Sequence, residues 1–189
     1  MSELIVTEFV TLDGVMEAPG GEPTHPHSGW VGVYMTPEQG EYKMQEIVDA
    51  GSLLLGRVTY DGFAEAWPQR EGEFADRMNT LPKYVVSSTL AEPLAWNNST
   101  SLGGDAVAAV TELKRQPGGP IFAMGSATLV RTLLENDLVD ELRLMVFPLI
   151  VGGGLRCFPE SFHKAAFTPA ASTTFSSGVT AVSYRRAES

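Results

Sequence analysis

The feature that most constrains this fold is a pair of short apolar runs, each closed by a glycine. The first run is Ser52–Leu55, which Gly56 ends, and the second is Pro120–Met124, which Gly125 ends. The continuous apolar run Ser52–Leu55 predicts a strand buried on both faces, as in the centre of a parallel sheet, and Pro120–Met124 predicts a further strand. A helical stretch follows each run, so strand and helix alternate. This alternation predicts an α/β fold with a mostly parallel, doubly wound central sheet flanked by helices.

The other segments complete a single domain over residues 1–189. Leu4–Thr11 is rich in β-branched residues and predicts the first strand, and a long Pro- and Gly-rich loop follows over residues 13–34. Thr36 and Pro37 then predict the start of a helix that runs to about residue 49. Further strands are predicted at Lys83–Val86, Leu142–Phe147, Phe167–Phe175 and Val179–Tyr184. The last two strands predict a C-terminal antiparallel hairpin.

Composition excludes several classes of function. The net charge of −10 disfavours binding to nucleic acid or to a membrane surface, because both depend on clustered Lys and Arg. Cys157 is the only cysteine, and the first residues do not resemble a signal peptide, so we expect a reducing, cytoplasmic location. His25 and His27 form a pair with no evident third ligand, so we expect loop histidines and no metal.

Three strand-end turns carry the residue types that bind a dinucleotide. A glycine at the start of a helix lets a pyrophosphate approach the backbone N–H groups, and the helix dipole favours the negative charge. An arginine offers a planar fork of donors to a phosphate, and serine hydroxyls suit a ribose or its 2′-phosphate. The candidate cofactor-binding residues are Gly56, Arg57, Thr59, Ser87, Ser88, Gly125, Ser126, Ala127 and Thr128.

Each of these residues also has a simpler interpretation. Taken singly, the glycines are ordinary turns, Arg57 is a surface cation, and the serines are turn residues. Their joint placement at the ends of successive strands favours a shared site. Thr59 is predicted to supply the hydroxyl that caps its helix. No G-x-G-x-x-G motif follows a strand, which disfavours an ordinary NAD dehydrogenase.

The sequence gives weaker signals for the catalytic and substrate-binding residues than for the cofactor-binding residues. A reductase needs a proton donor near the hydride acceptor, and the candidate acids are Asp13, Glu38 and Glu41. Each also has a simpler explanation: Asp13 as a turn residue, and the two glutamates as part of a solvated helix face. Trp30 and Tyr34 are candidates for an apolar wall against a flat ring, although Trp30 is also a candidate for the core. Gly153, within a triple-glycine turn, either closes over the cofactor or links two strands.

The chain resembles the dihydrofolate reductase superfamily, and within it the bacterial branch related to the riboflavin-biosynthesis reductase, the RibD C-terminal domain. The resemblance covers nearly the whole chain, in order. It rests on the segments Val10–Val15, Leu54–Tyr60, Lys83–Thr89, Phe122–Ser126, Leu138–Leu142 and Phe147–Gly154.

This resemblance implies an NADPH site. Gly56, Arg57 and Thr59 would lie near the phosphates, Ser87 and Ser88 near the adenosine 2′-phosphate, and Gly125 with Ser126 at the pyrophosphate and nicotinamide. It also implies a homodimer. We therefore expect an NADPH-dependent reductase of a small pterin-like or pyrimidinone-like heterocycle. The alternatives are a dimeric protein that binds a nucleotide or pterin without turnover, and the riboflavin-pathway reductase of a ribosylamino-pyrimidinone phosphate.

Overall fold

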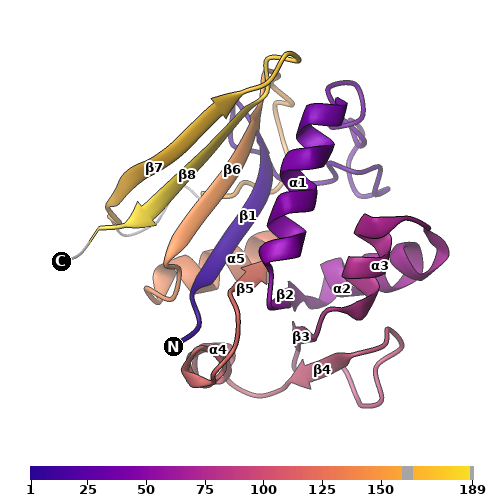
Figure 1. The fold of residues 1–189 in the computed structure, drawn as a ribbon, viewed down its shortest axis with the longest axis vertical. Coiled ribbons are helices and arrows are strands. Elements are labelled where there is room, and N and C mark those ends of the chain that lie inside the picture. The colour runs from indigo at the N-terminus through magenta and orange to yellow at the C-terminus, as the bar shows by residue number, and fades with distance from the viewer. Residues whose placement is uncertain (159–163, 188–189) are drawn as a thin grey trace.

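In the computed structural model, residues 1–158 and 164–187 are described, and they form an eight-stranded sheet with helices on both faces (Figure 1). The strands are β1 (Leu4–Thr11), β2 (Ser52–Gly56), β3 (Lys83–Val86), β4 (Ser99–Leu102), β5 (Ile121–Ala123), β6 (Glu141–Phe147), β7 (Phe167–Thr174) and β8 (Thr180–Arg186). The helices are α1 (Pro37–Asp49), α2 (Arg57–Ala66), α3 (Glu73–Thr80), α4 (Ala106–Arg115) and α5 (Ala127–Glu135), and a 3-10 turn spans Trp67–Gln69.

The strand order is β4-β3-β2-β5-β1-β6-β8-β7. All pairs from β4 to β6 are parallel, whereas β8 pairs antiparallel with both β6 and β7. The mostly parallel sheet and the C-terminal antiparallel hairpin are therefore confirmed. β5 is only three residues long and pairs with β1 on one side and β2 on the other. Beyond the end of β5, β1 and β2 have no strand between them in the described part of the chain.

Two apolar layers hold the helices on the sheet. Ile47 of α1 and Met78 of α3 pack on one face with Phe122, while Val110 of α4 and Val130 of α5 pack on the other. The central strand β2 is buried along its whole length, as its apolar sequence predicts. Within the described residues, no helix is both long enough and apolar enough to cross a bilayer.

The sequence analysis did not identify β4 and α4. β4 reads Ser-Thr-Ser-Leu and is only partly buried, because it forms the edge of the sheet beside β3. An edge strand does not need the apolar pattern by which the central strands were predicted. α4 does carry helix signals, since the Asp105 carboxylate accepts a hydrogen bond from the N–H of Ala108 at the start of the helix.

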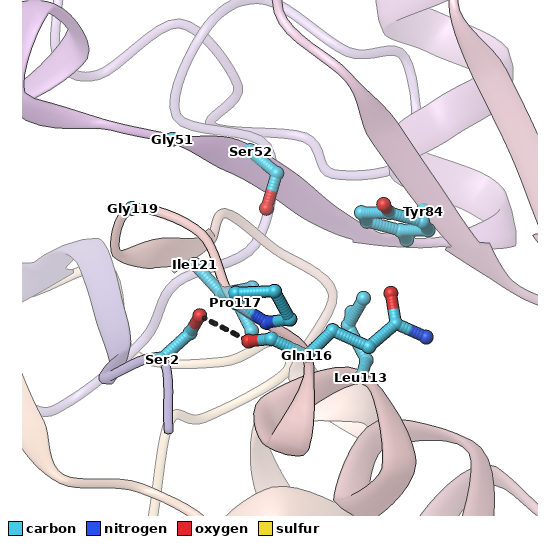
Figure 2. A pocket seen from close by; sticks show the side chains of 9 residues that line it. All are labelled: Ser2, Gly51, Ser52, Tyr84, Leu113, Gln116, Pro117, Gly119 and Ile121. Carbon is cyan, nitrogen blue, oxygen red and sulfur yellow. Dashed lines mark hydrogen bonds between the residues drawn. The ribbon is translucent and has the colours of Figure 1, made fainter.

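At the amino ends of β2 and β5, two glycine backbones touch. A side chain on Gly51 would place its Cβ 2.6 Å from the Cα of Gly119. A small pocket of about 60 Å³ opens beside this contact (Figure 2), and Ser2 closes one side through a 3.1 Å hydrogen bond to the carbonyl of Gln116. This pocket lies at the opposite end of the strands from the turns that carry the candidate cofactor residues.

The Gly51 contact predicts a stability difference between two glycine substitutions. Gly51→Ala forces two backbones apart, so we expect it to lower the free energy of unfolding by about 1–3 kcal/mol in urea denaturation. Gly62→Ala is the matched control, because Gly62 lies within α2 with no atom near its Cβ position. That control should raise stability by about 0.5–1 kcal/mol. Equal effects of both substitutions would contradict the packing described.

Candidate functional site

The three candidate turns lie at the carboxyl ends of neighbouring strands. Along the sheet, Ser87 follows β3, Gly56 ends β2, and Gly125 follows β5, in the order in which these strands pair. In open α/β sheets, ligands bind outside this edge, where strand order reverses. The structure therefore brings the predicted cofactor residues to one edge.

The turns after β2 and β5 are in direct contact. A Cβ on Gly56 would lie 2.3 Å from the Oγ of Ser126, and a Cβ on Gly125 would lie 2.5 Å from the Oγ1 of Thr59. Gly125 has a φ of +57° and is joined to Ser126 by a cis peptide bond. Glycine at both positions therefore allows a backbone approach that a side chain would block.

Two helices begin at this contact. α2 starts at Arg57 after Gly56, and α5 starts at Ala127 after Ser126, and neither first turn is capped by a side chain. Their first backbone N–H groups therefore have no intrahelical partners. Two helix N-termini side by side, together with the hydroxyls of Ser126 and Thr59, suit a pyrophosphate. Thr59 was wrongly predicted as the helix cap: Gly56 occupies that position, and Thr59 is the third residue of α2.

Arg57 links the β2 turn to the β3 turn. Its guanidinium donates hydrogen bonds to Thr89 Oγ1 and, at 3.3 Å, to Asp61 Oδ2, while about half of the side chain remains exposed. Ser87 Oγ accepts hydrogen bonds from the N–H groups of Thr89 and Leu90, which shapes the turn. Ser88 is exposed, and its hydroxyl makes no hydrogen bond within the described residues.

Glu8 is an acid at this edge that the sequence analysis missed. It lies on β1, is only 8% exposed, and its Oε1 accepts a 2.6 Å hydrogen bond from the N–H of Gly125. Burial raises the pKa of the Glu8 carboxyl to about 8, although the bond from Gly125 and the charge of Lys43 act in the opposite direction. The available signal was a single acid within the apolar strand Leu4–Thr11.

Asp13 binds the backbone of a neighbouring loop. Its carboxylate accepts hydrogen bonds from the N–H groups of Val151 and Gly152 and from the hydroxyl of Thr11. The bond from Thr11, followed by the two backbone bonds, lowers the pKa of Asp13 to about 2. Asp13 is therefore ionised at neutral pH and carries no proton to donate there.

Glu38 and Glu41 lie on the first turns of α1. Glu38 Oε2 accepts hydrogen bonds from the backbone N–H and hydroxyl of Ser176, which tie α1 to the β7–β8 turn. Glu41 is exposed to solvent. Neither residue has a contact with the three turns among the hydrogen bonds and ion pairs of the described residues.

Trp30 and Tyr34, which were predicted to line the substrate site, pack against the hydrophobic core. Trp30 is 5% exposed, its Nε1 donates a hydrogen bond to the Glu17 carbonyl, and its ring packs edge-on against Phe147. Tyr34 is half-buried against the same Phe147 ring. Gly153 is exposed, with no atom near its Cβ position. Among the described residues, no three potential metal ligands come together.

The bonds to Asp13 predict a pH-dependent contribution to stability. Because the folded pKa lies below the ordinary value of 3.8, this carboxylate stabilises the fold above about pH 4 and loses that effect as the pH falls toward 2. Asp13→Asn should therefore lower the melting temperature at pH 7, and the gap to wild type should narrow on acidification. Asp49→Asn, at an exposed position, is the control. A gap that does not change with pH would contradict this role.

Comparison with known proteins identifies a family whose model matches nearly the whole chain, and two relatives of similar length. The family model of the RibD C-terminal domain matches residues 2–181. The uncharacterized protein YyaP of Bacillus subtilis is 29% identical over 186 residues, covering 96% of this chain and 93% of that protein. YwjB of the same organism, also uncharacterized, is 28% identical over 152 residues, covering 80% of this chain and 79% of YwjB.

Solved structures show the same fold. A Shewanella protein assigned to riboflavin biosynthesis superposes with a TM-score of 0.75 at 20% identity, covering 98% of this chain and 99% of that one. A pyrimidine reductase-like protein from Corynebacterium diphtheriae gives 0.69 at 11% identity, with coverages of 100% and 93%. Acinetobacter baumannii RibD gives 0.66 at 14% identity, where the match spans 99% of this chain but 58% of RibD. The chain belongs to the RibD C-terminal domain family, within the dihydrofolate reductase-like fold.

Proposed function

We propose that this protein is an NADPH-dependent reductase of a small heterocycle. The observation that carries the proposal is the contact between the β2 and β5 turns, where Gly56 and Gly125 let the two turns pack so closely that two uncapped helix N-termini lie side by side. Family membership supports a reductase, and the resemblance of a solved relative to a pyrimidine reductase supports a heterocyclic substrate.

The residues present fit a dinucleotide phosphate. The N-termini of α2 and α5 would hold the pyrophosphate, and Arg57, half-exposed and already oriented by Thr89, would add a cation in a protein of net charge −10. Ser88 offers an exposed hydroxyl at the end of β3, where an adenosine 2′-phosphate would lie. When bound, the reduced cofactor supplies a hydride, and the protein orients the two reactants.

Single substitutions test this arrangement through cofactor binding. Arg57→Ala removes a charge-assisted hydrogen bond and should weaken NADPH binding by about tenfold to a hundredfold in a fluorescence titration. Ser88→Ala should weaken NADPH binding by about fivefold and leave NADH binding unchanged, because NADH lacks the 2′-phosphate.

Arg115→Ala is the matched control for the loss of a positive charge. Arg115 ends α4, and its guanidinium pairs with Glu112 at an exposed position. We expect its affinity for NADPH to equal that of wild type. Wild-type protein that binds neither NADPH nor NADH would contradict the proposed function, and equal losses in Arg57→Ala and Arg115→Ala would contradict the assigned site.

A further inference from the structure

The order of the strands would orient a bound dinucleotide along the sheet edge, and this inference rests on the proposed function. Ser88 follows β3, Gly56 ends β2, Gly125 follows β5, and Glu8 lies on β1, in the order in which the strands pair. The distance from β3 to β1 is three interstrand spacings, or about 14 Å. If the adenosine end lies at β3 and the pyrophosphate at the β2 and β5 turns, the nicotinamide end reaches β1. Glu8 is the acid at that position.

The carboxyl of Glu8 is held in place without a cationic partner. Oε1 is fixed by the N–H of Gly125, whereas Oε2 accepts no hydrogen bond from the part of the chain that the structure describes. Leu144 of β6 is the residue beside it on the other neighbouring strand. The carboxyl is therefore fixed at one oxygen, while the other has no hydrogen-bond partner among the described residues and can carry the proton.

Few charged groups act on this carboxyl. The charge of Lys43 favours its ionised form, but the Lys43 ammonium donates hydrogen bonds to Thr7 Oγ1 and to Glu46. Cys157 also interacts electrostatically with Glu8, and burial first and the charge of Glu8 second raise the pKa of the thiol, so the thiol stays neutral. Desolvation therefore dominates, and Glu8 keeps its proton at pH 7.

We propose that Glu8 is the acid that donates the proton in the reduction. The acceptor gains a hydride from the cofactor at carbon and a proton from Glu8 at the adjacent nitrogen or oxygen. The O–H bond of Glu8 breaks and an N–H or O–H bond forms, so the acceptor gains two electrons and two hydrogens. Glu8 is left as a carboxylate beside the oxidised cofactor and regains its proton from water.

The other candidate acids are less suited to this role. Asp13 is ionised at neutral pH and holds the Val151–Gly152 backbone, and Glu38 holds Ser176. Glu41 is exposed to solvent, which gives it no fixed orientation. Among the four acids considered, Glu8 alone combines burial with contact to a candidate cofactor-binding residue.

If Glu8 lies beside the nicotinamide, the affinities for the reduced and the oxidised cofactor should change in opposite directions with pH. The reduced nicotinamide is neutral, so it should favour protonated Glu8 and bind less tightly as the pH rises through about 8. The oxidised nicotinamide is positive, so it should favour ionised Glu8 and bind more tightly over the same range. Above about pH 7 the 2′-phosphate is almost fully ionised, so it contributes little to either trend.

The first test uses the wild-type protein alone. Calorimetry in buffers with different ionisation enthalpies measures the protons exchanged on binding. Near pH 8 we expect NADPH binding to take up about half a proton and NADP⁺ binding to release about half a proton. Proton exchange of the same sign for both forms would overturn the assignment, because Glu8 would then face the pyrophosphate rather than the nicotinamide.

The second test compares Glu8→Gln with Glu112→Gln. Glutamine keeps an oxygen for the Gly125 N–H but does not titrate, whereas Glu112 is an exposed acid on α4. Between pH 7 and pH 9, wild type and Glu112→Gln should lose about tenfold in NADPH affinity, and Glu8→Gln should show no such change. If wild type and Glu8→Gln bind NADPH and NADP⁺ with the same pH profile, the proposed role of Glu8 as proton donor is wrong, and the proposed reductase function still stands. If wild type binds neither NADPH nor NADP⁺, both the proposed role of Glu8 and the proposed reductase function are wrong.

Discussion

The close approach of two turns is the constraint on which the candidate site depends. Gly56 and Gly125 bring the ends of β2 and β5 together so tightly that the hydroxyls of Ser126 and Thr59 occupy the places where side chains would stand. This contact aligns the N-termini of α2 and α5 at one point of the edge. Because β5 stops after three residues, the same turn also reaches Glu8 on β1. The proposed phosphate site and the proposed proton donor therefore depend on the same turn, which follows β5.

Glu46 and Glu8 are two of the three buried glutamates among the described residues, and their hydrogen-bond partners differ. Glu46 of α1 receives hydrogen bonds from Thr7 and Lys43 and lies 3.6 Å from a guanidinium nitrogen of Arg143, so it belongs to a network of polar side chains between α1 and the sheet. Glu8 has the backbone amide of Gly125 as its partner, and in the described part of the chain no cation forms an ion pair with it. The carboxyl of Glu8 lacks such a network, and its burial raises its pKa.

Local signals made most of the fold predictable. The apolar run that ends at Gly56, the cap at Thr36 and the paired C-terminal strands are readable within a few residues, and the corresponding elements are present. The edge strand β4 was missed because a half-exposed strand needs no apolar pattern. Glu8 was missed because its environment is set by Gly125, which lies 117 positions away in the sequence. Trp30 could be assigned to the core only once its packing against Phe147 was known.

The location of the cofactor is the central claim, and amide chemical shifts test it most directly. NADPH added to ¹⁵N-labelled protein should shift the backbone resonances of Gly56, Ser88, Gly125 and Ser126, which lie at one edge of the sheet. Resonances at the opposite end of the strands, around Gly51 and Gly119, should stay in place. Shifts confined to that opposite end, or to the exposed groove of the β7–β8 hairpin, would contradict the account.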